Sequence, residues 1–331
     1  MFEKLLPRNE HTADRVIRVL LGLVGLSLAG ATISLAAPAA SALGEPDATL
    51  QAAVDSAVAE VLHRFAERQL RADQMAVTVV DLTEASHPTH ASHRGTAPIY
   101  PASVIKLFYL AAAHRWIEDG RLEDTDELRR ALRDMIVDSS NDAAHYVVDL
   151  LTGTTSGPEL PQPELEQWQH QRNSVNRYFE SLGYTDINVN KKPWCEGPYG
   201  RESQAMRAFE PRRNLLTTEA TAHLMVEIAT GMAVTRERST SMMQLLRREL
   251  KGSEAEIQGQ ARFTGPALPA GSRLWSKAGW TSETRHDAAY VELPDGRKFV
   301  LVVFTEGQAN ERGILHTLAR LLTKPMRTGE R

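Results

Sequence analysis

A serine and a lysine three residues apart, Ser103 and Lys106, are the residues of this sequence best suited to nucleophilic chemistry. Apolar residues at helical spacing from Val104 to Ala112 predict a helix here, ended at Gly120, and a helix places both side chains on one face. A serine hydroxyl needs a neighbouring base to attack a carbonyl, and a lysine serves when its surroundings lower its pKa. Serine at a helix start is also a common cap, so the pair alone leaves both roles open.

Two later stretches carry polar residues at short, regular spacing. Ser139 and Asn141 stand where a helix is predicted to begin, and Lys277 and Gly279 stand on a predicted strand. Each has an ordinary explanation when taken singly, such as a helix cap or a surface charge. In chain order, however, the three motifs are S-x-x-K, S-x-N and K-x-G. This order resembles that of the penicillin-recognising serine hydrolases, which include the class A β-lactamases and the DD-peptidases.

The resemblance covers the chain from about Leu50 to Leu322. It implies an α/β (α+β) fold of the β-lactamase/DD-peptidase type, in which an antiparallel sheet is flanked by helices. An all-helical subdomain at about residues 104–213 is expected within a serine hydrolase domain at residues 43–331. The same resemblance implies that Ser103 becomes acylated, and that Lys106 takes part in removing its proton.

The remaining motif residues receive roles from the same resemblance. Ser139 is expected to pass a proton toward the departing nitrogen, and Asn141 to hold the acylamino group of the substrate. Lys277 is expected to attract a substrate carboxylate, while Gly279 lets the substrate backbone approach the strand. The backbone N–H groups of Ser103 and Trp280 are the expected oxyanion hole.

The sequence departs from the family pattern at three places. Ala278 stands where the family has Thr or Ser, and Ser140 stands where it has Asp. The E-x-x-L-N pattern that carries the general base of class A enzymes is absent. Glu196 and Glu202 are the candidates for this base, and the alternative for each is a solvated loop carboxylate.

Hydrolysis of β-lactam amides is therefore the expected activity. The alternatives are a DD-peptidase acting on peptidoglycan stem peptides, and a binding module that is acylated but not turned over. A net charge of −4 gives no reason to expect a nucleic-acid partner. The single cysteine, Cys195, and the lack of an H-E-x-x-H motif argue against a metal site, and no cofactor is expected. We expect a monomer.

The first 42 residues predict a signal peptide or a membrane anchor. Basic residues precede an uncharged run at residues 19–42, and they are Lys4, Arg8, Arg15 and Arg18. Ala40-Ser41-Ala42 is a small-x-small cleavage site, and the apolar run is also long enough to span a bilayer if uncut. Both versions predict export, to a periplasmic or secreted location, with anchoring through this segment if it is retained.

Further along the chain, strand and helix patterns supply a framework for the motifs. Residues Met75–Asp81 are rich in β-branched side chains and predict a first strand. Three histidines and a proline within residues 87–93 indicate an exposed turn, followed by a shorter strand at about residues 94–99. A helix is predicted at residues 239–250, and a strand hairpin around the Pro294-Asp295-Gly296-Arg297 turn.

Overall fold

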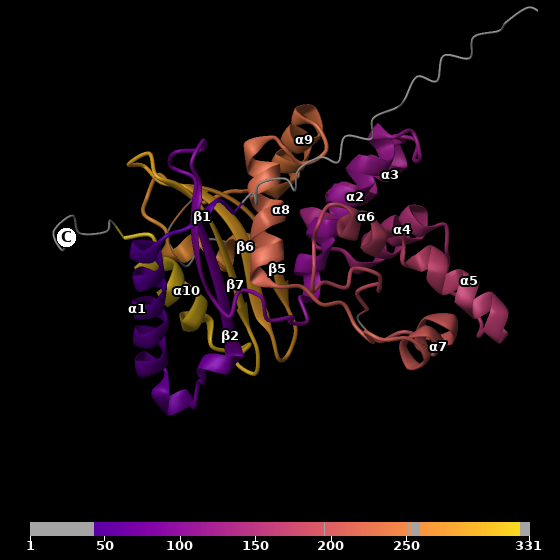
Figure 1. The fold of residues 1–331 in the computed structure, drawn as a ribbon, viewed down its shortest axis with the longest axis horizontal. Coiled ribbons are helices and arrows are strands. Elements are labelled where there is room, and N and C mark those ends of the chain that lie inside the picture. The colour runs from indigo at the N-terminus through magenta and orange to yellow at the C-terminus, as the bar shows by residue number, and fades with distance from the viewer. Residues whose placement is uncertain (1–42, 195, 251, 253–258, 325–331) are drawn as a thin grey trace, which may run out of the picture. The chain divides into compact units, whose positions relative to one another are not determined.

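Seven strands form one sheet in the computed structural model, which describes residues 43–194, 196–250, 252 and 259–324 (Figure 1). The strands are β1 (Glu45–Pro46), β2 (Met75–Asp81), β3 (Thr89–His93), β4 (Arg247–Arg248), β5 (Arg273–Trp280), β6 (Arg285–Glu292) and β7 (Lys298–Thr305). Their order is β1-β3-β2-β7-β6-β5-β4. All neighbours pair antiparallel except β1 and β3, which are parallel. The sheet is therefore mixed, with the expected antiparallel pairing everywhere but at one edge.

Ten α-helices of the described residues flank this sheet. They are α1 (Ala48–Arg64), α2 (Lys106–Glu118), α3 (Asp126–Ile136), α4 (Asn141–Thr152), α5 (Gln162–Arg172), α6 (Ser174–Ser181), α7 (Gly200–Ala208), α8 (Thr218–Thr230), α9 (Arg236–Leu246) and α10 (Arg312–Leu322). Helices α1 and α10 cover one face of the sheet, and α8 covers the other (Figure 1). Helices α2 to α7 gather beyond α8, where the helical subdomain is predicted.

Alternation along the strands divides the core into two layers. Val77 and Val79 of β2 pack with α1 and α10, whereas Ala76 and Val80 face the layer that contains α2 and α8. Successive side chains of a strand point to opposite faces, so a strand buried on both faces is apolar throughout. This explains why β2 coincides with the strand predicted from its β-branched residues.

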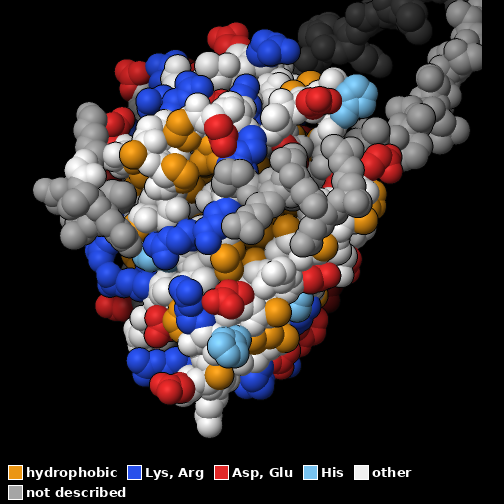
Figure 2. Space-filling model, turned by 90° about the vertical axis from the view of Figure 1, so that its left-hand side faces the viewer, with side chains coloured by type: hydrophobic (Ala, Val, Ile, Leu, Met, Phe, Trp, Pro, Cys, Tyr) orange, Lys and Arg blue, Asp and Glu red, His pale blue; other side chains and the backbone are white. Residues whose placement is uncertain are grey.

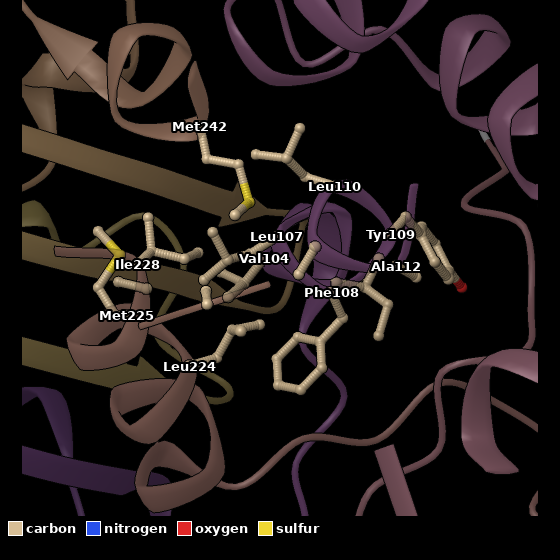
Figure 3. Close-up of a cluster of buried hydrophobic side chains, with 14 of the residues drawn as sticks. Val104, Leu107, Phe108, Tyr109, Leu110, Ala112, Leu224, Met225, Ile228 and Met242 are labelled. Carbon is tan, nitrogen blue, oxygen red and sulfur yellow. The ribbon is translucent and has the colours of Figure 1, made fainter. Parts of the chain in front are cut away.

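Helix α2 lies in the middle of the second layer and is buried on nearly all sides. Figure 3 shows Leu107 and Val104 beside Leu224 and Ile228 of α8, with Met242 of α9 close by. A helix that is apolar around its whole circumference belongs in a core. The chain that carries Ser103 and Lys106 is thus anchored on several sides.

The predicted second strand is displaced from its expected place. We predicted it at about residues 94–99, but β3 spans Thr89–His93, so two of the three histidines lie on a strand. Ala91 of β3 is buried against Val79 of β2, and a left-handed residue, Arg94 (φ 51°), ends the strand. Pro88 is the last residue before the strand. Its lack of an N–H group therefore removes no hydrogen bond between the strands.

The predicted helix at residues 239–250 needs adjustment, because it begins earlier, as α9, and ends where the short strand β4 joins the sheet. Between residues 162 and 181 the chain forms two helices, α5 and α6, which meet at Asn173. Glu202, for which a position in a solvated loop was one alternative, lies on α7.

The surface around α1 carries charges of both signs. Figure 2 shows Lys and Arg side chains interspersed with Asp and Glu over this face, with small hydrophobic areas between them. Within the described ranges, no helix is both long and apolar enough to span a membrane. The predicted signal peptide or anchor at residues 1–42 lies outside those ranges.

One buried histidine joins the sheet to the chain that leads into Ser103. His286 of β6 donates from Nε2 to the carbonyl oxygen of Tyr100 (2.9 Å) and accepts at Nδ1 from the Thr305 N–H (3.0 Å). These two bonds require the neutral ring with its proton on Nε2. Burial lowers the pKa of His286 to about 4.

Acid should destabilise the fold through His286. Its folded-state pKa of about 4 lies below the ordinary 6.5. The neutral ring therefore contributes fully to the free energy of unfolding above pH 6.5, and this contribution is lost as the pH falls toward 4. The expected decrease in the free energy of unfolding is about 3 kcal/mol. Urea unfolding of the wild type and of His286→Gln at about pH 7 and about pH 4.5 measures it, because glutamine offers a donor and an acceptor but does not titrate in this range.

His87→Gln is the matched control, since His87 is an exposed histidine in the loop before β3. It should lose as much stability in acid as the wild type, while His286→Gln should lose clearly less. Equal losses in all three proteins would show that His286 does not carry the effect.

Candidate active site

Ser103 lies on a 3₁₀ turn, Ala102–Ile105, that leads directly into α2. The predicted helix is therefore present, but its first turn is tighter than an α-helix. No side chain makes a capping hydrogen bond at the start of this turn or of α2, so Ser103 is not a helix cap. Ala102 adopts a left-handed conformation (φ 47°), which non-glycine residues adopt at a cost. The packing around α2 holds the serine in this strained turn.

The Lys106 ammonium is the centre of the polar cluster. Its Nζ lies 3.1 Å from Ser103 Oγ and 2.7 Å from Asn141 Oδ1. It also lies 2.6 Å from the backbone oxygen of Ser139 and 3.3 Å from Ser139 Oγ. The Ser139 carbonyl oxygen and Asn141 Oδ1 can only accept, and they match the two N–H donors of a neutral amine. The remaining contacts are with hydroxyls, so the arrangement is compatible with a neutral amine whose lone pair accepts a proton from one of them.

Ser139 Oγ is shared by two lysines. Lys277 Nζ donates to it at 2.9 Å, and the Lys277 side chain is completely buried. Ser139 is held in a left-handed conformation (φ 58°) just before α4, while its neighbour Ser140 caps that helix by accepting from Ala143 N–H (3.2 Å). The serine that replaces the family's aspartate therefore has a structural role here.

Burial lowers the pKa of Lys277 well below its usual value, and the positive charges of Lys106 and Arg248 lower it further. Asp287 acts in the opposite direction. Two cationic side chains placed on one hydroxyl favour the loss of a proton from one of them. The cluster therefore favours one neutral amine beside one ammonium.

Strand β5 passes very close to the serine turn. A side chain at Gly279 would place its Cβ 2.7 Å from the Pro101 carbonyl oxygen and 2.9 Å from the Ser103 backbone nitrogen, so glycine is required there. The Ala278 N–H bonds to a side chain outside the sheet, not to β6. Because strand residues alternate in direction, the N–H of Trp280 points to that same outer edge. The Ser103 backbone nitrogen thus lies close to β5 at Gly279, the residue before Trp280.

Two groups of residues at this site escaped sequence reasoning. The first is Gln260, whose carboxamide contacts Lys277 and Ala278. The second is a set of three arginines, Arg262, Arg285 and Arg312, which line a cavity of about 560 Å³ beside Trp280 and Gln260. Gln260 stands outside any periodic pattern, and the arginines come from three separate segments, so no spacing signal marks them.

Positive side chains outnumber negative ones in the arginine cavity, whose charged lining residues are the three arginines and Asp138. Burial and the charges of Arg312 and Arg262 lower the pKa of Arg285 to about 10, against the opposing effect of Asp287. None of the three guanidinium groups forms an ion pair with any residue in the described ranges. The Arg285 guanidinium packs on the Phe263 ring at 4.0 Å, which directs it along the cavity wall. Uncompensated cations of this kind attract an anionic ligand group.

The structure does not bring Glu202 into the cluster. Glu202 lies on α7, is buried, and pairs with Arg172 (2.6 Å) and Lys192 (3.6 Å). It also accepts from Ser156 Oγ (3.0 Å). It is thus neither the solvated loop carboxylate nor in hydrogen-bonding contact with Ser103 or Lys106. Glu196 is exposed, in the loop before α7.

Histidine, cysteine and carboxylate groups do not gather into a metal site anywhere in the described ranges. The groups gathered around Lys106 and Lys277 are two hydroxyls, two amines, an amide and backbone N–H donors. This set suits acyl transfer through a serine.

Comparisons with known proteins identify a family and a fold for this chain. Residues 125–324 match the Beta-lactamase2 family, described as a β-lactamase enzyme family. No curated protein matches the sequence. A β-lactamase from Sphaerobacter thermophilus is similar in structure, with a TM-score of 0.58, 20% sequence identity, and coverage of 82% of this chain and 95% of that one.

Two further solved structures have the same fold. A β-lactamase from Xanthomonas campestris aligns with a TM-score of 0.60 at 14% identity, covering 82% of this chain and 97% of that one. A mutant of PBP-A, in an acyl-enzyme complex with penicillin G, aligns with a TM-score of 0.58 at 16% identity, covering 84% and 96%. Structural similarity at such identities shows the fold alone. The family match, however, spans more than half of the sequence, and the chain therefore belongs to the β-lactamase enzyme family.

Proposed function

We propose that this protein is a serine β-lactamase whose nucleophile is Ser103. The observation that carries the proposal is the placement of Lys106 Nζ 3.1 Å from Ser103 Oγ and 3.3 Å from Ser139 Oγ. In its neutral form Lys106 accepts the Ser103 proton while Oγ bonds to the β-lactam carbonyl carbon. The β-lactam C–N bond then breaks, and its nitrogen receives a proton from the Ser139 hydroxyl, which Lys106 reprotonates.

The charges of the site support an anionic substrate. Lys277 is buried beside Ser139, and the cavity of Arg262, Arg285 and Arg312 lies beyond Trp280. A carboxylate placed between them receives charge-assisted hydrogen bonds. Asn141 Oδ1 accepts from Lys106 Nζ, which fixes this side chain at the site where the acylamino group of a substrate is expected. The oxyanion goes to the N–H groups of Ser103 and Trp280.

A second candidate, a penicillin-binding enzyme with a persistent acyl-enzyme, is favoured by one observation. A class A mechanism requires a carboxylate that activates water beside the acylated serine. The Glu202 carboxylate instead forms ion pairs with Arg172 and Lys192. Such an enzyme is a DD-peptidase if a D-Ala-D-Ala peptide releases the acyl group, and a binding module if nothing does.

Ser103→Ala should abolish covalent labelling by a fluorescent penicillin, because it removes the hydroxyl that lies beside Lys106 Nζ on the turn packed against Gly279 of β5. Removal of one partly buried hydroxyl should cost only about 1 kcal/mol of stability. Intact mass spectrometry and a thermal melt measure the two effects. Undiminished labelling of the folded variant would remove Ser103 from the mechanism.

Glu196→Gln should slow deacylation by roughly a hundredfold or more if Glu196 activates the water, so that the acyl-enzyme accumulates in a single turnover. Glu202→Gln should instead lower stability by about 3 kcal/mol, because it leaves Arg172 and Lys192 with less compensating charge. Intact mass against time, with parallel urea unfolding, separates these outcomes.

Glu180→Gln, at an exposed position on α6, is the control for loss of a surface carboxylate. It should deacylate at the wild-type rate. If neither Glu196→Gln nor Glu202→Gln slows deacylation, the class A route does not apply. A wild-type adduct that persists would favour the second candidate.

We further propose that the protein is exported, on the evidence of the basic residues and the uncharged run in residues 1–42. Expressed in a bacterium, it should fractionate outside the cytoplasm. A mature N-terminus at Leu43 would indicate cleavage, and an intact chain in the membrane pellet would indicate anchoring. A full-length product in the cytoplasmic fraction contradicts both versions.

A further inference from the structure

The Gln260 carboxamide uses all of its hydrogen-bonding capacity between two motifs. Its Oε1 accepts from Lys277 Nζ (2.8 Å) and from the Ala278 N–H (3.0 Å). Its Nε2 donates to the carbonyl oxygens of Ile136 (2.6 Å) and Val137 (2.9 Å). An amide side chain offers two acceptor sites and two donors, so none is left over. A fully satisfied buried network of this kind fixes the positions of the groups that it joins.

We propose that Gln260 is a positioning residue for acylation, which sets the distance between the Lys277 ammonium and the Ser139 hydroxyl. The proposal rests on the function proposed above. Ile136 and Val137 lie three and two residues before Ser139, while Lys277 and Ala278 lie on β5. Gln260 thus links the chain before the S-x-N motif to the K-x-G motif on β5. The contact that it spans is the 2.9 Å hydrogen bond between Lys277 and Ser139.

The neutrality of Gln260 matters as much as its geometry. The oxygens on Lys277 Nζ are those of Gln260, Ser139 and the Ala278 backbone, none of which carries a charge. The charged groups that face Lys277 are Lys106 from α2, Arg248 from β4 and Asp287 from β6. Gln260 thus holds the ammonium by an uncharged acceptor, which leaves its positive charge available to a substrate anion.

Gln260 also accounts for a departure from the family motif. Ala278 replaces the expected Thr or Ser, and its side chain packs in the layer that contains Phe263 and Ala267. The nearby hydroxyl of Thr281 is used elsewhere, because it accepts from the backbone N–H groups of the turn residues Glu283 and Thr284. Ala278 therefore makes its polar contact through the backbone, because its N–H donates to Gln260 Oε1.

Two substitutions separate the bonds of Gln260 from its volume. Gln260→Met fills similar space without any of the four hydrogen bonds, and Gln260→Glu keeps the acceptor toward Lys277 but makes it anionic. Acylation by a fluorescent penicillin should slow by about tenfold to a hundredfold in Gln260→Met, because a hydrogen bond to a charged group is lost. The substrate concentration for half-maximal rate should rise in Gln260→Glu, because its carboxylate competes with that of the substrate.

The titration of Lys277 supplies a readout that a merely structural role would not change. Loss of the acceptor in Gln260→Met disfavours the ammonium, so the pKa of Lys277 should fall. A carboxylate in Gln260→Glu favours it, so the pKa should rise. NMR of lysine labelled with ¹³C at Cε follows this titration without any substrate, and Lys277→Met identifies the signal.

Gln51→Met is the matched control. Gln51 clamps α1 to β3 in the same two-sided manner, through the N–H (3.2 Å) and carbonyl oxygen (3.0 Å) of Ser92, on the other side of the sheet. It should leave both acylation and the Lys277 titration at wild-type values. Movement of the Lys277 pKa in one direction in both Gln260 variants, or in neither, would overturn the proposal. So would acylation within about twofold of the wild type in Gln260→Met.

The two proposals fail separately. If wild-type protein is not labelled at Ser103, the proposed function is wrong, and the Lys277 titration still decides whether Gln260 holds the ammonium. If the wild type is labelled and Gln260→Met is labelled equally fast, the function stands and Gln260 has no part in positioning. Because Gln260→Glu is nearly isosteric, it decides the titration even if Gln260→Met does not fold.

Discussion

Two lysine amines meet at one hydroxyl, and the rest of the structure serves to keep them there. Lys106 and Lys277 both lie within hydrogen-bonding distance of Ser139 Oγ. If both amines were protonated, their charges would repel, and this repulsion favours one neutral amine beside one ammonium. Negative charge that develops on a bound substrate is attracted by the ammonium, so the arrangement favours the transition state over the empty site. The fold must supply the energy that holds the two amines together.

That energy comes from the apolar layers on either side of the sheet. Helix α2 carries Lys106 and is packed on nearly every side, while β5 carries Lys277 between β4 and β6. Side chains from α2, α8 and α9 interlock around the start of α2 (Figure 3). Such close packing also maintains the left-handed residues Ala102 and Ser139, whose conformations would relax in a looser structure.

Sequence patterns predicted the parts of the structure that repeat or that follow a family order. Strand β2 and helix α4 were predicted well because apolar periodicity reports burial directly. The motif residues Ser103, Lys106 and Lys277 converge because their elements pack in the expected manner. The displaced strand β3 has a different cause. Its polar side chains show no clear alternation, and pairing with β2 determines where it lies.

Other site features depend on contacts between distant segments, which no local pattern records. Gln260 bonds with residues more than a hundred positions earlier and seventeen positions later. The ion pair of Glu202 with Arg172 likewise joins α7 to α5. These contacts have a consequence for the sheet edge. Beyond the two residues of β4, the outer edge of β5 is occupied by side chains, because Arg248 binds the Ser276 carbonyl and Gln260 binds the Ala278 N–H. An exposed edge invites strand addition by another chain, so these two side chains should protect the protein from aggregation along β5.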